Sequence, residues 1–207
     1  MKISVEAKVE GNKIIIDLSP SQLKKLTTKE TKVKLSSLTP GDDFLIGDEA
    51  FIVLEQTDNG TRVIAKEFVR YGVMFGDNSD WKLSTVRKTL NNEYFKKIAT
   101  IVGEKNIISM DRDLTSLDGL DDYGTCTDKV SLLTATEYAK YHKILGLKSN
   151  YPEWWWLITP ASTPSNNYAC NVCSVDSIGV LDWRGCGFTG GLRPFLTLNS
   201  AITVSKG

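Results

Sequence analysis

Three consecutive tryptophans, Trp154, Trp155 and Trp156, constrain the fold more than any other feature of this 207-residue chain. Side chains of this size and apolarity are costly to expose and need a core. Neighbouring side chains of a strand point to opposite faces, so we expect Trp154 and Trp156 on one face and Trp155 on the other. The run Pro194-Phe195-Leu196-Thr197-Leu198 has the same buried character. Together the two runs predict a frame of buried strands.

The segment between these runs, residues 163–190, has a different composition. It is rich in Gly, Asn, Ser, Asp and Cys, carries scattered aromatics and shows no helical period. Such loops on a rigid frame are typical of binding surfaces rather than catalytic pockets. We therefore predict a display surface over residues 163–190 and no catalytic residues. The predicted ligand-binding residues are Asn166, Asn167, Tyr168, Cys170, Asn171, Cys173, Asp176, Asp182, Trp183, Arg184, Cys186 and Phe188.

Within this segment Leu181-Asp182-Trp183-Arg184-Gly185 predicts a loop tip. An exposed tryptophan beside an arginine has the composition of a binding hot spot. The alternative interpretation is that Trp183 is buried in the core. Arg193, in the Gly-Gly-Leu-Arg-Pro run, is expected to make a buried charge-assisted hydrogen bond within the frame.

Composition excludes several classes of function. The 25 Lys and Arg balance the 25 Asp and Glu, which leaves no electrostatic footprint for nucleic acid. No apolar run approaches the roughly 18 residues of a membrane span, so no direct membrane insertion is expected. The first residues lack the apolar core of a signal peptide, and we expect cytoplasmic synthesis with the four cysteines as free thiols.

Local patterns predict two parts of the chain. Residues 3–9 and 14–18 alternate around Gly11-Asn12 and indicate a β-hairpin, after which Ser19 begins a short helix. Residues 1–32 are therefore expected to form a small hairpin-helix module and residues 33–207 the main domain. That domain begins with a meander of three short strands, predicted at 44–46, 51–54 and 62–65.

Two helices are predicted in the middle of the chain. Ser84 caps the first, in which Val86, Leu90, Tyr94 and Ile98 recur at three- or four-residue steps. Thr134 to Glu137 form a capping box that opens the second, with Tyr138, Tyr141 and Leu145 on one face. The acidic residues 111–128 between them are expected to be a surface loop. Strands and helices in this irregular order favour an α+β fold.

Three possible chemical sites have only weak support in the sequence. Cys170 and Cys173 have the spacing of one zinc knuckle, but the second pair is missing, so incidental thiols are favoured over a metal site. The single histidine, His142, is not expected to act as a catalytic base, because no serine of the sequence stands in a nucleophile-elbow motif. The aspartates of residues 111–122 do not have the spacing of an EF-hand loop. No metal and no cofactor is predicted.

Five blocks of sequence occur in a fixed order along the chain. The blocks are Gly41-Asp42-Asp43-Phe44-Leu45-Ile46-Gly47 with Phe51-Ile52-Val53-Leu54, Trp81-Lys82-Leu83-Ser84-Thr85-Val86-Arg87-Lys88-Thr89-Leu90-Asn91, Leu132-Leu133-Thr134-Ala135-Thr136-Glu137-Tyr138, Trp155-Trp156-Leu157-Ile158-Thr159-Pro160-Ala161 and Gly191-Leu192-Arg193-Pro194-Phe195-Leu196. Together they resemble an uncharacterised domain family common in gut Firmicutes and their phages. The resemblance covers roughly residues 35 to 200, and Ile158 replaces an arginine that is usual in the family.

The ending of this family also resembles C-type-lectin-like domains, including formylglycine-generating enzymes and the variable proteins of diversity-generating retroelements. The resemblance implies a C-type-lectin-like α+β fold and a non-enzymatic ligand-recognition protein. Its partner would be a cell-surface protein or glycan, with display on a virion or cell surface and an oligomer allowed. Most predicted binding residues are reachable from an asparagine codon by adenine changes, Trp183 excepted. The alternatives are a thiol oxidase of the formylglycine-generating type, using Cys170, Cys173 or Cys186, and a structural phage or cell-envelope module.

Overall fold

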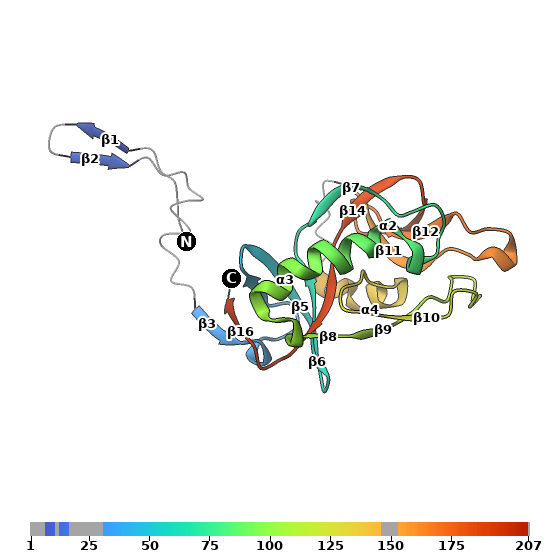
Figure 1. The fold of residues 1–207 in the computed structure, drawn as a ribbon, viewed down its shortest axis with the longest axis horizontal. Coiled ribbons are helices and arrows are strands. Elements are labelled where there is room, and N and C mark those ends of the chain that lie inside the picture. Colours follow the sequence, from blue (N-terminus) through green and yellow to red (C-terminus); the bar gives the residue numbers. More distant parts are fainter. Residues whose placement is uncertain (1–6, 11–12, 17–30, 146–152, 207) are drawn as a thin grey trace. The chain divides into compact units, whose positions relative to one another are not determined.

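The computed structural model describes residues 7–10, 13–16, 31–145 and 153–206, which form two compact units, Met1–Thr31 and Lys32–Gly207. In the first unit, strand β1 (Ala7–Glu10) pairs antiparallel with β2 (Lys13–Ile16), as the alternating pattern predicts (Figure 1). The turn between these strands and the helix predicted after Ser19 lie outside the described residues.

The second unit, Lys32–Gly207, is built mainly of antiparallel strands in two larger sheets and one small one. A seven-stranded sheet has the order β3 (Thr31–Lys34), β16 (Thr203–Lys206), β4 (Asp43–Ile46), β5 (Glu49–Thr57), β6 (Gly60–Ala65), β15 (Phe195–Leu198), β8 (Ile107–Ile108). A five-stranded sheet has the order β13 (Leu181–Gly185), β12 (Asn171–Val175), β11 (Trp155–Pro160), β14 (Thr189–Leu192), β7 (Arg70–Met74). Strands β9 (Met110–Asp113) and β10 (Thr125–Asp128) pair separately.

The fold class predicted from the sequence is wrong. The second unit is mainly β, a curled half-barrel, and not the expected α+β, C-type-lectin-like fold. Strands β9, β10, β12 and β13 lie where loops were expected, and β7 lies where no element was predicted. These strands are four or five residues long, and all but β12 carry Gly, Asp or Arg, so most of them lack the apolar alternation that marks a half-buried strand.

The predicted meander is confirmed. Strands β4 and β5 form a hairpin around Gly47-Asp48, and β5 pairs with β6 along its length. The second turn is Asp58-Asn59, because Thr57 pairs with Gly60.

The apolar runs are explained by strands that are buried on both faces. Along β11, Trp156 enters one core cluster and Trp155 enters the other, and both side chains are fully buried. Trp154 packs edge-on against Trp156, with ring centroids 4.6 Å apart, which confirms that these two share a face. Residues of β5 divide in the same way, with Phe51 and Val53 in the first core and Ile52 and Leu54 in the second.

Two short segments carry the chain directly between the two sheets. One is the link from β6 to β7, and the other is Arg193-Pro194, between β14 and β15. Backbone bonds join the links: Ala65 N–H donates to the Pro194 carbonyl at 2.9 Å, and Val69 N–H donates to the Leu192 carbonyl at 2.9 Å. The Arg193 side chain is fully buried, as predicted, and its Nε donates to the Ala65 carbonyl at 3.1 Å.

Helices cover both cores. The first helical stretch runs through α2 (Thr85–Thr89), the π-helical turn η3 (Leu90–Tyr94) and α3 (Phe95–Val102); the second is α4 (Ala135–Leu145). Both predicted starts are confirmed. Ser84 Oγ accepts from Arg87 N–H at 3.0 Å. At the capping box, Thr134 N–H donates to Glu137 at 2.9 Å and Glu137 N–H donates to Thr134 Oγ1 at 3.0 Å. Short 3-10 turns are η1 (Leu35–Ser37), η2 (Trp81–Leu83), η4 (Glu104–Asn106) and η5 (Pro164–Asn166).

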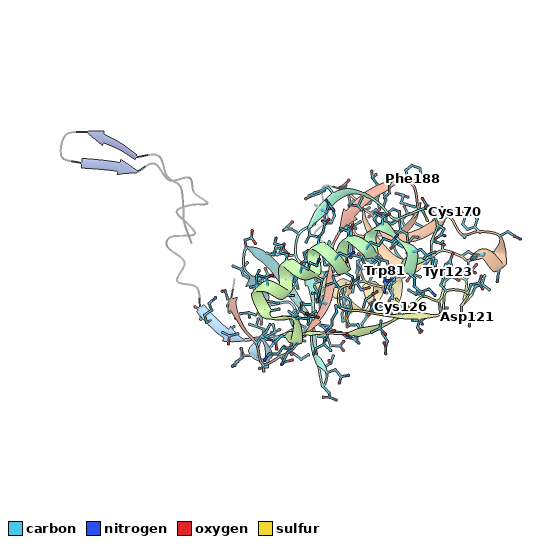
Figure 2. The ribbon with its side chains drawn as sticks, viewed as in Figure 1. Trp81, Asp121, Tyr123, Cys126, Cys170 and Phe188 are labelled. Atoms are coloured by element: carbon cyan, nitrogen blue, oxygen red, sulfur yellow. The ribbon has the colours of Figure 1, made fainter. Side chains whose placement is uncertain are left out.

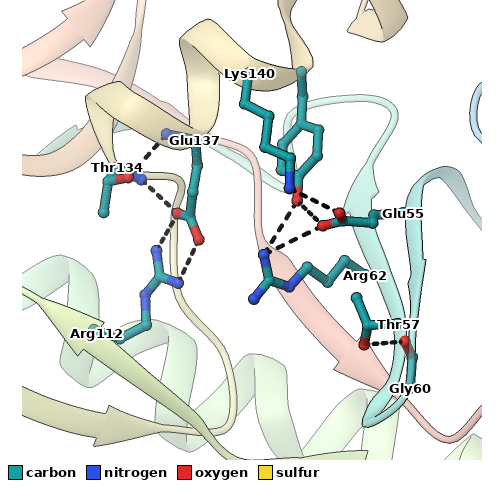
Figure 3. Close-up of polar contacts among 9 residues, drawn as sticks. Glu55, Thr57, Gly60, Arg62, Arg112, Thr134, Glu137 and Lys140 are labelled. Carbon is teal, nitrogen blue, oxygen red and sulfur yellow. Dashed lines mark hydrogen bonds and ion pairs between the residues drawn. The ribbon is translucent and has the colours of Figure 1, made fainter.

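Two polar clusters hold α4 against the sheets (Figure 3). In one, Arg112 of β9 donates to both carboxylate oxygens of Glu137, and both side chains are largely buried. In the other, Glu55 of β5 accepts from Lys140 at 2.7 Å and from the Tyr141 hydroxyl at 2.6 Å. In the described part of the chain, no helix is long and apolar enough to cross a membrane.

Candidate surface for ligand recognition

The centre of the predicted display segment is a β-hairpin rather than a loop. Strands β12 and β13 pair in the register Cys173↔Trp183, and β13 is the outermost strand of its sheet. The orange hairpin projects at the right-hand end of the second unit in Figure 1. Trp183, predicted at a loop tip, lies in the middle of β13 and is 54% exposed.

The two faces of this hairpin differ in character. Leu181 and Trp183 project from the same face of β13, since they are two residues apart. Phe188 packs beside Gly185, where an added Cβ would lie 3.1 Å from its ring, and continues this row. All three side chains are exposed, and Tyr168 lies nearby through its hydroxyl, which accepts from Asn171 Nδ2 at 2.7 Å. The result is an apolar and aromatic face.

The opposite face carries charge. Asp182 and Arg184 are partly exposed and form an ion pair with each other. The Arg184 guanidinium also lies over the Trp154 ring, 5.8 Å from its centroid. A cation above an aromatic face is attracted to it, so this contact ties the edge strand to the buried tryptophan cluster.

The segment before the hairpin is held by the acidic loop of residues 114–124. Asp122 accepts from both the backbone N–H and the hydroxyl of Ser165, each at 2.8 Å. Asp118 accepts from Ser162 Oγ at 2.6 Å. Hydrogen bonds from Ser165 N–H lower the pKa of Asp122, and those from Ser116 and Ser162 lower the pKa of Asp118. These carboxylates thus anchor the chain at Ser162 and Ser165, ahead of the hairpin.

The predicted ligand-binding residues fall into three groups. Six are exposed: Asn166, Asn167, Tyr168, Cys170, Trp183 and Phe188. Four are partly buried: Asn171, Asp176, Asp182 and Arg184. Cys173 and Cys186 are buried, so they cannot contact a ligand on this surface. Figure 2 labels Phe188 and Cys170 on this segment.

Comparison with protein families identifies the domain. The profile described as Domain of unknown function (DUF6273) matches residues 59–200, more than half of the chain. The chain belongs to this family. No curated protein and no solved structure matches this chain. Four of the five sequence blocks lie within the matched residues, whereas the first, at residues 41–54, precedes them.

The sequence marked residues 163–190 of this DUF6273 domain as a candidate surface but did not show how much of that surface is apolar. Eleven large apolar side chains are exposed among the described residues, and six of them lie within residues 163–190. Three of these six, Ile178, Val180 and Leu181, were not among the predicted binding residues. These three aliphatic residues could have been noticed in the sequence. Aliphatic side chains exposed on a turn and an edge strand indicate an interaction site.

A pocket of about 220 Å³ on the DUF6273 domain was also missed. It lies beside the π-helical turn, a feature frequent at functional sites. Glu49 accepts there from the Tyr94 hydroxyl at 2.7 Å and pairs with Lys97. Burial and the neighbouring Glu49 carboxylate raise the pKa of Tyr94. The polar groups of this pocket bond to one another, and no hydrophobic periodicity reveals the extra residue of a π-turn.

The four cysteines are free thiols in different surroundings. Burial raises the pKa of Cys173 and of Cys186 to about 12, and that of Cys126 to about 11, whereas Cys170 is exposed. Among the described residues, no group of three His, Cys, Asp or Glu side chains has the geometry to hold a metal ion.

We expect one thiol of the native protein to react quickly with a disulfide reagent near pH 8, and we expect that thiol to be Cys170. Cys173 and Cys186 should react more slowly by on the order of 100-fold or more, because burial keeps them protonated and shielded. Time-resolved thiol titration of native and denatured protein measures this, with Cys170→Ala as the control. Fast reaction of Cys186 in native protein would contradict the assignment.

Proposed function

We propose that this domain recognises a cell-surface ligand through the surface of residues 163–190, without catalysing a reaction. The observation that carries the proposal is the concentration of exposed apolar side chains there, six of the eleven among the described residues. Contiguous apolar exposure on a folded domain marks an interaction site. Isolated exposed apolar residues elsewhere need no such explanation.

The composition of the surface favours a protein ligand over a glycan. Ile178, Val180 and Leu181 add exposed aliphatic area to the segment that carries the exposed aromatic side chains of Trp183 and Phe188. Sugars are bound mainly through hydrogen bonds and flat aromatic stacking, whereas aliphatic clusters need an apolar partner to bury them. The flanking Asn and Ser residues supply the adaptable hydrogen bonds that paratopes use.

The frame beneath the surface is rigid. Cys173 and Val175 of β12 pair with Trp183 and Leu181 of β13, so they share a face of the sheet, and both are fully buried. The Tyr138 hydroxyl of α4 donates to the Gly179 carbonyl at 2.6 Å and fixes the hairpin turn. Side chains held on a preorganised frame lose little entropy when they bind, so the hairpin suits recognition.

The thiol-oxidase alternative has less support. Two of its candidate nucleophiles, Cys173 and Cys186, are buried with raised pKa values, and the thiolate is the reactive form. If the segment varies between copies, as in diversity-generating retroelements, variation should avoid these two positions. A reverse-transcriptase gene beside a near-copy of this coding segment would support that part of the proposal.

The test replaces two anchors of the surface. We expect Trp183→Ala with Arg184→Ala to weaken binding to intact host bacterial cells by roughly 10- to 100-fold, because tryptophan and arginine dominate interface energies. The melting temperature should change little, since both side chains are partly or largely exposed. Binding of fluorescently labelled protein to cells before and after surface proteolysis measures affinity and separates a protein ligand from a glycan.

The matched control is Leu83→Ala with Lys88→Ala, an exposed apolar residue and an exposed cation outside the surface. This control should bind like the unmodified protein. Unchanged binding by the Trp183 and Arg184 variant would place recognition elsewhere, and unfolding of that variant would show that the hairpin belongs to the core.

A further inference from the structure

The outer edge of β13 is open to another strand. In the part of the chain that the structure describes, β12 pairs with one side of β13 and nothing pairs with the other. Bonds at both ends of the hairpin use even-numbered residues: Asp176 N–H donates to the Val180 carbonyl at 2.9 Å and Cys186 N–H to the Cys170 carbonyl at 2.8 Å. Backbone groups alternate in direction along an antiparallel strand, so those of Trp183 point away from β12.

The contacts of the Trp183 backbone agree with this direction. Its N–H donates to Asp182 Oδ1 at 2.8 Å, and its carbonyl accepts from Arg184 Nη1 at 3.2 Å. Both partners are neighbouring side chains at the surface, where such bonds are readily exchanged for others. An exposed edge with outward N–H and C=O groups is a template for strand pairing.

The edge is complementary to itself. When two copies of residues 181–185 run antiparallel about a two-fold axis at Trp183, Asp182 of each copy lies opposite Arg184 of the other. Opposite charges at such cross-strand positions stabilise a pair of strands. A shift by one residue removes both charge pairs, and a shift by two residues places two aspartates or two arginines opposite each other. Charge therefore selects a single register.

We propose that β13 pairs with β13 of a second copy of this chain in the register centred on Trp183, which joins two five-stranded sheets into one. The two Trp183 residues exchange N–H···O=C bonds, and the Gly185 N–H of each copy faces the Leu181 carbonyl of the other. The Gly185 carbonyl already accepts from Phe188 N–H at 2.9 Å and adds no bond. The pairing uses the edge of β13 and the proposed recognition surface uses its face, so either can hold without the other.

Sedimentation velocity of the full chain without ligand, from about 1 to about 500 µM, tests the pairing, since an interface of this size is a weak one. We expect a reversible dimer whose dissociation constant lies in the micromolar range. Arg184→Asp should raise that constant by about 10-fold or more, because two attractive pairs become repulsive. Asp182→Arg should do the same, because it places an arginine opposite Arg184 of the other copy.

The matched control is the exchanged variant, Asp182→Arg with Arg184→Asp. It restores opposite charges across the two-fold axis, so its dissociation constant should return to within about 3-fold of the original. Thermal unfolding of each variant confirms that the chain is folded. A chain that stays monomeric at every concentration, a dimer indifferent to charge reversal, or an exchanged variant that fails to recover overturns the proposal. Each of these results leaves the ligand-binding test unaffected.

Discussion

Replacing Trp156 with alanine is expected to lower the free energy of unfolding by about 3–5 kcal/mol, the range for deleting a large buried aromatic side chain. Trp156 is fully buried, and its ring lies 5.4 Å from that of Phe75 and 4.6 Å from that of Trp154. Its indole N–H also donates to the Val73 carbonyl at 2.8 Å, which ties β11 to β7 across the five-stranded sheet. The substitution therefore removes both packing and a hydrogen bond.

Urea denaturation followed by far-ultraviolet circular dichroism measures this loss. Trp183→Ala is the matched control, because it deletes the same side chain at a position that is 54% exposed. That control should cost no more than about 0.5 kcal/mol. A loss below about 1 kcal/mol for Trp156→Ala would contradict the two-sided burial of β11.

Burial on both faces also explains why part of the fold was predictable. The runs Phe51-Ile52-Val53-Leu54 and Trp154-Trp155-Trp156 are too apolar for any exposed strand, so their place in the core followed from composition. The caps at Ser84 and Thr134 were equally predictable, because each rests on side-chain chemistry within three residues.

The fold class was not predictable in the same way. Strands β7, β9 and β13 contain Arg-Tyr-Gly-Val-Met, Met-Asp-Arg-Asp and Leu-Asp-Trp-Arg-Gly, in which charged residues interrupt the apolar pattern. These segments are strands because a neighbouring strand supplies their hydrogen bonds, which is a long-range property. Local patterns showed both helices but few of these strands. The share of strands was therefore underestimated, and the fold class was wrongly predicted as α+β.

The candidate site was predicted as a segment but not as a surface. Asparagine, glycine and aromatic content marked residues 163–190, yet Cys173 is buried and Trp183 is exposed although the two residues pair on one face of the sheet. The difference arises because β12 lies inside the sheet and β13 at its edge, where Asp182 and Arg184 also lie. Composition shows that a segment suits binding, whereas pairing decides which side chains can reach a ligand.

The second large loss in the free energy of unfolding is expected when the buried ion pair between Arg112 and Glu137 is broken. We expect Arg112→Leu to cost about 3–5 kcal/mol, because it leaves the Glu137 charge buried without its partner. Arg112 is 4% exposed, donates to Glu137 Oε1 at 2.9 Å and to the Leu132 carbonyl at 3.0 Å, and lies over the ring of Phe195. Arg112→Leu with Glu137→Gln removes the orphaned charge and should cost less than Arg112→Leu alone.

The stability loss caused by Arg112→Leu should depend on pH. Burial opposes ionisation of Glu137, but hydrogen bonds and charge from Arg112 and the Thr134 N–H outweigh it and lower the pKa below its ordinary value of 4.5. In the unmodified protein this group stabilises the fold fully above about pH 4.5, and the contribution is lost as pH falls through the folded pKa.

Without Arg112, burial dominates and the pKa of Glu137 rises. The penalty of Arg112→Leu should therefore be largest near neutral pH and shrink as the solution is acidified. Denaturation of the three proteins between about pH 7 and pH 4 measures this, and a penalty that grows towards acid would show that Glu137 does not carry it.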